Sequence, residues 1–130
     1  MPRLPLIPWL AAALLCASWN AASGASYNSG IELLKQCRAA IESYGSPEIA
    51  DVADAVVVKS LLCAEKIRAV VAAHELLPVT EPQWCMAEEE NANEQAAQRV
   101  VKYLELYPEY QNRNDIFLIV QALQWAYPCD

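Results

Sequence analysis

Four cysteines are spread over the part of this chain that follows its apolar N-terminal segment: Cys37, Cys63, Cys85 and Cys129. None of them stands in a C-x-x-C or C-x-x-H unit, so the sequence indicates neither a zinc site nor a redox motif. An even number of distant cysteines behind an export signal is typical of structural disulfides formed in an oxidising compartment. The pattern therefore predicts a fold stapled by two disulfides outside the cytoplasm.

Residues 1–25 have the features of a secretory signal peptide. A basic residue near the start is followed by an apolar run, and small residues lead up to Ala25. We expect cleavage after Ala25, with Ala22 as the alternative. The apolar run of about a dozen residues is shorter than the roughly 20 needed to span a bilayer. Cys16 follows a leucine instead of the small residue that lipidation requires, so we expect it to leave with the signal.

The remaining residues, 26–130, are enough for a single domain. The chain has 16 acidic and 9 basic residues, for a formal net charge of −7. Such a surface repels nucleic acid and anionic lipid, and it favours a basic protein partner. We expect no contact with nucleic acid, and none with a membrane once the signal is removed.

Two helices are predicted in the first half. Ser29 and Glu32 form a capping box, and Gly45 ends the helix that follows. Its apolar positions recur at helical spacing: Ile31, Leu34, Cys37, Ile41 and Tyr44. Ser46 and Pro47 open the second helix, whose stripe comprises Ile49, Val52, Val56, Ser60, Cys63, Ile67, Val70, His74 and Leu77. This stripe fits one long helix or two broken near Ser60, while a short strand at residues 56–58 is the competing interpretation.

Two more helices are predicted in the second half, after a long proline-containing loop. Asn91 and Glu94 form a capping box for a helix that runs through Tyr107, and Pro108 closes it. Asn112 with Asp115 caps the last helix, whose apolar face is Ile116, Ile119, Val120, Leu123 and Tyr127. The fold class is all-α, a small bundle of four to five helices.

The disulfide connectivity is predicted from the loop. The proline-containing segment can bring Cys85 back toward the middle of the second helix, so we pair Cys63 with Cys85. Cys37 then pairs with Cys129 and ties the first helix to the last.

The loop from Leu77 to Asn93 is the candidate binding site. It carries an aromatic residue beside several carboxylates, a combination enriched in protein interfaces; the site residues are Glu81, Trp84, Glu88, Glu89 and Glu90. The alternative is that the acidic run is simply solvated and complements a helix N-terminus. We place Trp84 outside the helical stripes, and Trp125 and Tyr127 in the core.

Catalysis finds little support in the sequence. His74 is the only histidine, and its place on an apolar stripe favours a structural role. No nucleophile or acid partner is indicated for it, and the acidic run lacks the glycine turn and alternating oxygen ligands of a calcium loop. We expect a binding protein without cofactor or metal, and not an enzyme.

The sequence also resembles the Rap/Tai family of periplasmic immunity proteins. The resemblance rests on the opening segment 29–37, the run Val-Val-Lys-Tyr-Leu-Glu at 100–105 with Pro-Glu at 108–109, and the closing Tyr-Pro-Cys at 127–129. The segments that follow Cys63 and Cys85 depart from the family pattern, and they fall where a partner surface would lie.

The resemblance implies a small helical periplasmic protein, often a homodimer, that protects a bacterium from cell-wall amidases delivered by type VI secretion. Such a protein acts by occupying the catalytic cleft of the toxin. The alternative function is an acid-stress periplasmic chaperone, which exposes apolar surface when its carboxylates are protonated.

Overall fold

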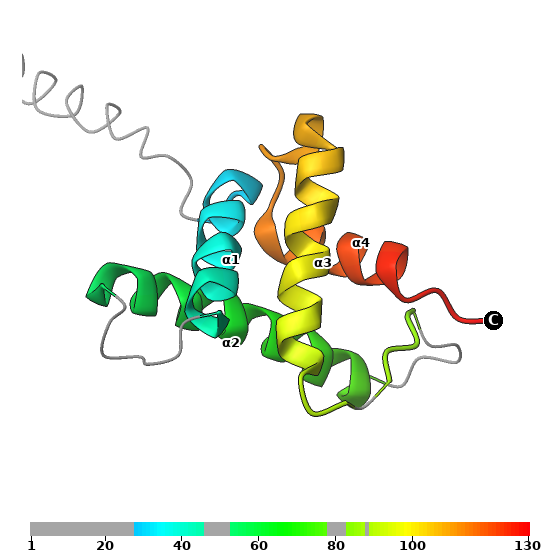
Figure 1. Ribbon diagram of the computed structural model, residues 1–130. Helices are drawn as coiled ribbons and strands as arrows, with labels where there is room; N and C mark the ends of the chain where they lie inside the picture. The colour runs from blue at the N-terminus through cyan, green and yellow to red at the C-terminus, as the bar shows by residue number, and fades with distance from the viewer. Residues whose placement is uncertain (1–27, 46–52, 78–82, 88) are drawn as a thin grey trace, which may run out of the picture.

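The computed structural model describes residues 28–45, 53–77, 83–87 and 89–130 (Figure 1). Its element order is α1 (Gly30–Tyr44), α2 (Asp54–Leu76), α3 (Ala92–Leu106), the 3-10 turn η2 (Pro108–Tyr110) and α4 (Asp115–Ala126). Within these ranges the β-type pairing is an isolated bridge between Ser29 and Asn114. The predicted all-α fold class is confirmed. The predicted signal peptide lies outside the described residues.

The first helix begins and ends where its caps predict. The Ser29 hydroxyl accepts a hydrogen bond from the Glu32 backbone N–H, and the N–H of Gly45 bonds back to the Ile41 carbonyl. The Glu32 carboxylate pairs with Lys35. The predicted face was partly wrong, because Ile31 and Tyr44 are exposed.

A distant loop also caps α1. The backbone N–H groups of Gly30 and Ile31 donate to the carbonyls of Arg113 and Gln111, at 3.0 and 2.9 Å. The two segments approach so closely that a Cβ on Gly30 would lie 2.9 Å from the Gln111 Cα. The N-terminus of α1 and the turn before α4 therefore form one unit, and the unit requires glycine at position 30.

The second helix is continuous through Ser60, so neither a break there nor a strand at residues 56–58 occurs. Ser60 is buried and its hydroxyl lies 2.8 Å from that of Ser43, which joins α2 to α1. The helix begins at Asp54, after Ala53 in a non-helical conformation, so the predicted start at Ser46 and Pro47 was wrong; residues 46–52 themselves lie outside the described residues.

The N-terminal caps of α3 and α4 differ from the caps that the sequence predicted. Asn91 precedes α3 but makes no side-chain cap; its Oδ1 instead accepts from Gln95. Asn114, not Asn112, caps α4 by accepting from the Phe117 N–H at 3.2 Å. The Asp115 backbone N–H, which a cap at Asn112 would have served, donates instead to the Asn28 carbonyl at 3.0 Å.

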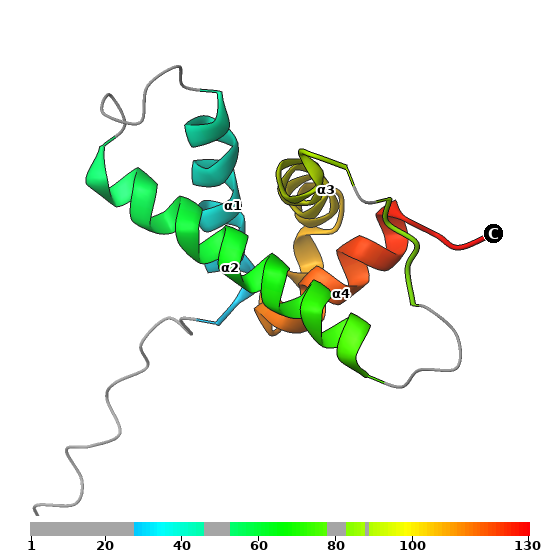
Figure 2. The ribbon, with the colours of Figure 1, turned by 90° about the horizontal axis from the view of Figure 1, so that it is seen from below.

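The helices form a bundle in which α1 packs against α2 and α3, and α3 packs against α4. In Figure 1, α1 and α3 stand side by side while α2 crosses beneath them; Figure 2 shows α2 running across the near side of the bundle. The buried core is Leu33, Leu34, Cys37, Ala40, Cys63, Ile67, Val70, Trp84, Ala96, Ala97, Val100, Val101, Tyr103, Leu104, Leu118, Ile119, Ala122 and Leu123. Among the described residues, no helix has the length and apolar content to cross a membrane.

The predicted disulfide connectivity was wrong. Cys37 bonds to Cys63, and Cys85 bonds to Cys129. Because α1 packs directly on α2, Cys37 and Cys63 meet in the core, where both are fully buried. The Cys85 N–H donates to the Tyr127 carbonyl at 2.8 Å, which brings the third cysteine beside the fourth. The described segment 83–87 therefore lies against α4 and the C-terminal residues, and Cys85 is not brought to the middle of α2.

Candidate binding site

The segment 83–87 crosses one end of the bundle and is held by several contacts. The Gln83 backbone N–H donates to His74 Nε2 at 3.0 Å, and the Gln83 side chain accepts from Gln124 Nε2 at 2.7 Å. Two residues later in the segment, Cys85 is tied to the C-terminal residues by its disulfide with Cys129 and by the hydrogen bond from its backbone N–H to the Tyr127 carbonyl. The segment is thus attached to α2, to α4 and to the residues after α4.

Trp84 does not project from this segment as an exposed anchor. Its side chain is 6 % exposed and belongs to the core cluster, so its placement outside the core was wrong. The indole stacks on the His74 imidazole with ring centroids 4.1 Å apart. His74 is half-buried, and its Nε2 acts as an acceptor; its role here is structural.

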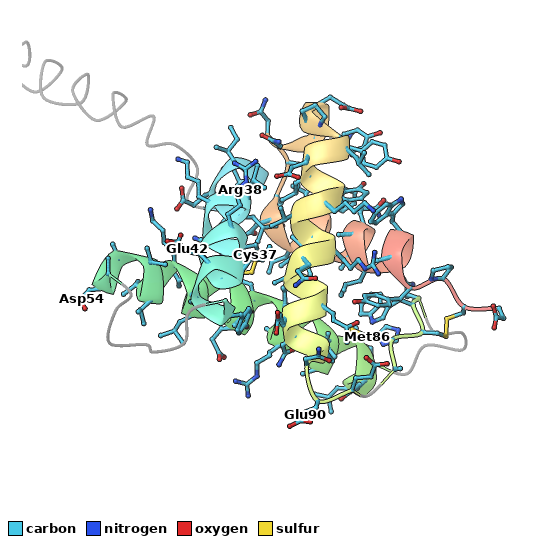
Figure 3. All side chains as sticks on the ribbon, in the orientation of Figure 1. Cys37, Arg38, Glu42, Asp54, Met86 and Glu90 are labelled. Atoms are coloured by element: carbon cyan, nitrogen blue, oxygen red, sulfur yellow. A yellow bond between two sulfur atoms is a disulfide. The ribbon has the colours of Figure 1, made fainter. Side chains whose placement is uncertain are left out.

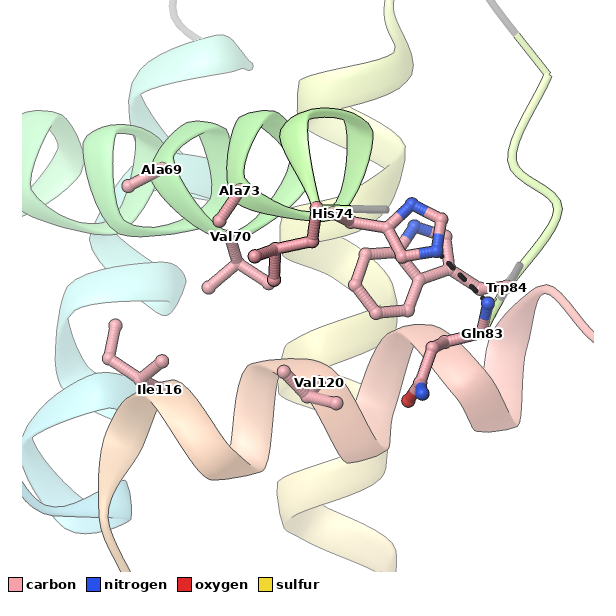
Figure 4. Close-up of a pocket in the computed structure, with 9 residues that line it drawn as sticks. Ala69, Val70, Ala73, His74, Gln83, Trp84, Ile116 and Val120 are labelled. Atoms are coloured by element: carbon pink, nitrogen blue, oxygen red, sulfur yellow. Dashed lines mark hydrogen bonds between the residues drawn. The ribbon is translucent and has the colours of Figure 1, made fainter. Parts of the chain in front are cut away.

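The stacked pair closes one end of an apolar groove between α2 and α4, with a volume of about 360 Å³ (Figure 4). Ala69, Val70 and Ala73 line the α2 side, and Ile116 and Val120 line the α4 side. Ile116 is 42 % exposed, and Leu77 at the mouth is 60 % exposed. The groove is open, apolar and placed beside the segment that the sequence indicates.

A second hollow lies on the other side of the His74–Trp84 pair, with a volume of about 350 Å³. Its lining includes Glu75, Met86 and Glu89. Glu89 accepts a hydrogen bond from Gln95 at 2.8 Å, and Glu90 is exposed nearby at the start of α3 (Figure 3). Of the five predicted site residues, Trp84, Glu89 and Glu90 are thus described in one region, whereas Glu81 and Glu88 lie outside the described residues.

Sequence reasoning missed the contribution of α4. Ile116 and Val120 were assigned to the core face, yet they face an open groove. Trp125 was also assigned to the core, and it is 37 % exposed. Periodicity finds the apolar residues of a helix but does not say which of them a neighbouring helix covers, so the groove left no signal in the sequence.

The site has the composition of a binding surface. An apolar centre with a polar rim is the ordinary anatomy of a protein interface. Within the described part of the chain, no group of three or more His, Cys, Asp and Glu side chains is placed to hold a metal ion. The arrangement offers apolar surface and negative charge to a partner.

The fold and site thus define a small disulfide-stapled helical binding protein. A family model for Rap1a immunity proteins matches residues 29–129, and the chain belongs to this family. Neither the curated proteins nor the solved structures contain a match to it.

Proposed function

We propose that this protein is exported to the periplasm by residues 1–25 and there binds and blocks a type VI secreted peptidoglycan amidase. Membership of an immunity-protein family supports the binding of a secreted effector. The observation that carries the location of the site is the apolar groove beside the acidic loop. The protein acts by occupancy and performs no chemistry of its own.

The two parts of this surface contribute differently to binding. Apolar side chains of the effector enter the groove between α2 and α4, where burial stabilises the complex. The carboxylates of Glu75, Glu89 and Glu90 lie at or near the loop-side hollow and attract a basic effector surface, which raises the association rate more than the affinity. Glu81 and Glu88 belong to the same acidic loop in the sequence, and we include them in the proposed site.

The decisive experiment looks for an exported amidase encoded by a neighbouring gene and measures its binding to this protein. Ile116→Asp puts a charge into the groove, and we expect affinity to fall at least tenfold, about 1.4 kcal/mol. Ile31→Asp is a matched control, because both isoleucines are the second residue of their helix and they are 44 % and 42 % exposed. Equal affinities for the two variants would exclude the groove, and no binding by the wild-type protein would exclude this partner.

The acidic loop is tested by kinetics. Replacing Glu88, Glu89 and Glu90 together by Gln should slow association and flatten its dependence on salt, since screening then has less charge to act on. Asp54→Asn serves as the control, because Asp54 lies at the far end of α2 (Figure 3). An unchanged salt dependence would place these carboxylates outside the interface.

We also propose a homodimer, the assembly expected from the family resemblance, with the two-fold symmetry of most dimers. Sedimentation at about 100 μM, well above the Kd of a specific interface, measures this directly. A monomer at that concentration would contradict it.

A further inference from the structure

A third hollow, larger than the groove, lies between α3, η2 and α4. It has a volume of about 480 Å³, and its lining is Tyr103, Tyr107, Tyr110, Arg113, Phe117, Gln121, Gln124 and Trp125. We call this surface the aromatic hollow. Phe117 and Trp125 are 44 % and 37 % exposed, which is unusual for rings of this size in one small area.

The rings of the aromatic hollow are held in place by one another and by cations. Tyr103 and Tyr107 have centroids 4.9 Å apart, and Tyr107 stacks on Tyr110 at 5.9 Å. The Arg113 guanidinium lies 4.8 Å from the Tyr110 ring centre and 5.7 Å from that of Phe117. Rings fixed before a partner arrives lose little freedom on binding.

The charge of the aromatic hollow is opposite to that of the loop. Arg113 is the charged residue in its lining, and Lys102 lies over Trp125 at 5.9 Å. Burial raises the pKa of Tyr103, and Tyr110, Tyr107 and the nearby Glu109 carboxylate raise it further, while Arg113 acts in the opposite direction. This part of an otherwise acidic chain is therefore suited to a carboxylate-bearing partner surface, whereas the loop is suited to a basic one.

Helix α4 joins the aromatic hollow to the groove. Ile116 and Val120 line the groove, and Phe117 and Gln121, each one residue later, line the hollow. Gln124 also lines the hollow and donates to Gln83 at the edge of the groove. A stable interface buries about 800 Å² on each partner, from roughly 20 to 30 residues, which the few residues of the groove do not supply. An interface centred on the groove therefore needs neighbouring surface, and α4 leads directly from the groove to the aromatic hollow.

We infer that the aromatic hollow is a second contact surface for the same effector, and that it receives an acidic segment carrying an apolar side chain. This inference rests on the proposed function. The aromatic rings and the arginine are the residue types that most often dominate binding energy. The effector would then contact both faces of α4. Its basic surface would lie against the acidic loop, and its acidic segment would lie against Arg113.

The test uses the full mature protein and the amidase identified by the binding experiment of the proposed function. Phe117→Ala removes an exposed ring and should weaken binding at least tenfold by faster dissociation. Tyr44→Ala is the control, because Tyr44 is a 41 % exposed aromatic residue that lines none of the three hollows. Arg113→Gln should slow association, because it removes the positive charge that faces the acidic segment. Thermal unfolding of each variant shows whether the fold is kept.

Each of the following outcomes would overturn the inference and would point to a different role for the aromatic hollow. If Phe117→Ala binds within twofold of the wild type while Ile116→Asp does not bind, the interface stops at the groove and the proposed function stands. Faster association of Arg113→Gln would show that the hollow faces a basic surface. Saturable binding of a disaccharide-tetrapeptide fragment of peptidoglycan, lost in Phe117→Ala, would assign the hollow to the cell wall instead of the effector. Loss of dimerisation in Phe117→Ala would assign it to a second copy.

Discussion

At the scale of single residues, Trp84 shows how burial changes the meaning of a sequence pattern. A tryptophan beside glutamates in a loop is typical of an interface, yet here the indole packs on His74 and belongs to the core. The same ring forms a wall of the apolar groove and of the loop-side hollow. In the proposed site, Trp84 therefore shapes the groove and does not project from it.

Replacing Trp84 should consequently destabilise the whole domain. Trp84→Ala removes a buried ring and leaves a cavity, and losses of about 3 to 5 kcal/mol are typical of such changes. We expect a lower midpoint in chemical denaturation, together with weaker effector binding because the groove loses its end wall. Trp125→Ala, which removes an exposed indole, should cost clearly less stability. Equal stability losses for the two variants would contradict the placement of Trp84.

At the same scale, the side chains of a buried ion pair connect helices that are far apart in the sequence. Lys66 lies 2.7 Å from the Asp115 carboxylate and 3.0 Å from the Gln36 side-chain oxygen. Asp115 and Gln36 are almost fully buried, so these three side chains join α2, α4 and α1 inside the bundle. Neither the capping role assigned to Asp115 nor any local pattern indicated this, because the partners are far apart in the sequence.

At the scale of helices, local signals predicted where elements begin better than what they pack against. The cap at Ser29 and the end at Gly45 need only neighbouring residues, and both predictions are confirmed. The start of α4 depends on how η2 turns the chain and on the backbone bond from the Asp115 N–H to the Asn28 carbonyl. Such a contact spans most of the chain, so the cap was predicted two residues too early.

This difference gives a direct test of the α4 cap. Asn114→Ala removes the acceptor for the Phe117 N–H and should lower stability by about 1 kcal/mol. Asn112→Ala, an exposed asparagine two residues earlier, should have almost no effect. Thermal unfolding of both variants measures the difference. A larger loss for Asn112→Ala would show that the cap lies where the sequence pattern first indicated.

At the scale of the whole molecule, the two disulfides connect different parts of the fold. The pair Cys37–Cys63 is inside the core between α1 and α2, while Cys85–Cys129 fastens the binding segment to the C-terminus. The sequence predicted that all four cysteines would be paired but not the partners, because pairing depends on which helices are neighbours.

Removal of each disulfide should therefore have a different effect on stability and binding. In the chain-entropy treatment, loops closed over 26 and 44 residues are worth about 3.5 and 4 kcal/mol. We expect replacement of Cys37 and Cys63 by Ser to lower stability further than this, since it also places hydroxyls in the core. Replacement of Cys85 and Cys129 by Ser should lower stability by no more than the loop-closure amount, since both positions are exposed, and should in addition slow effector association, because the segment is no longer preorganised. Denaturation and binding kinetics separate the two effects, and identical behaviour of the two double variants would refute the distinction.

The pairing also has a consequence for how the chain matures. Among the four cysteines that follow residue 25, each bond joins consecutive ones, Cys37 with Cys63 and Cys85 with Cys129. A polypeptide that crosses a membrane N-terminus first presents Cys37 and Cys63 to an oxidase before Cys85 has emerged. Oxidation in order of appearance then yields the native bonds directly, and the protein has no need of an isomerase to correct them.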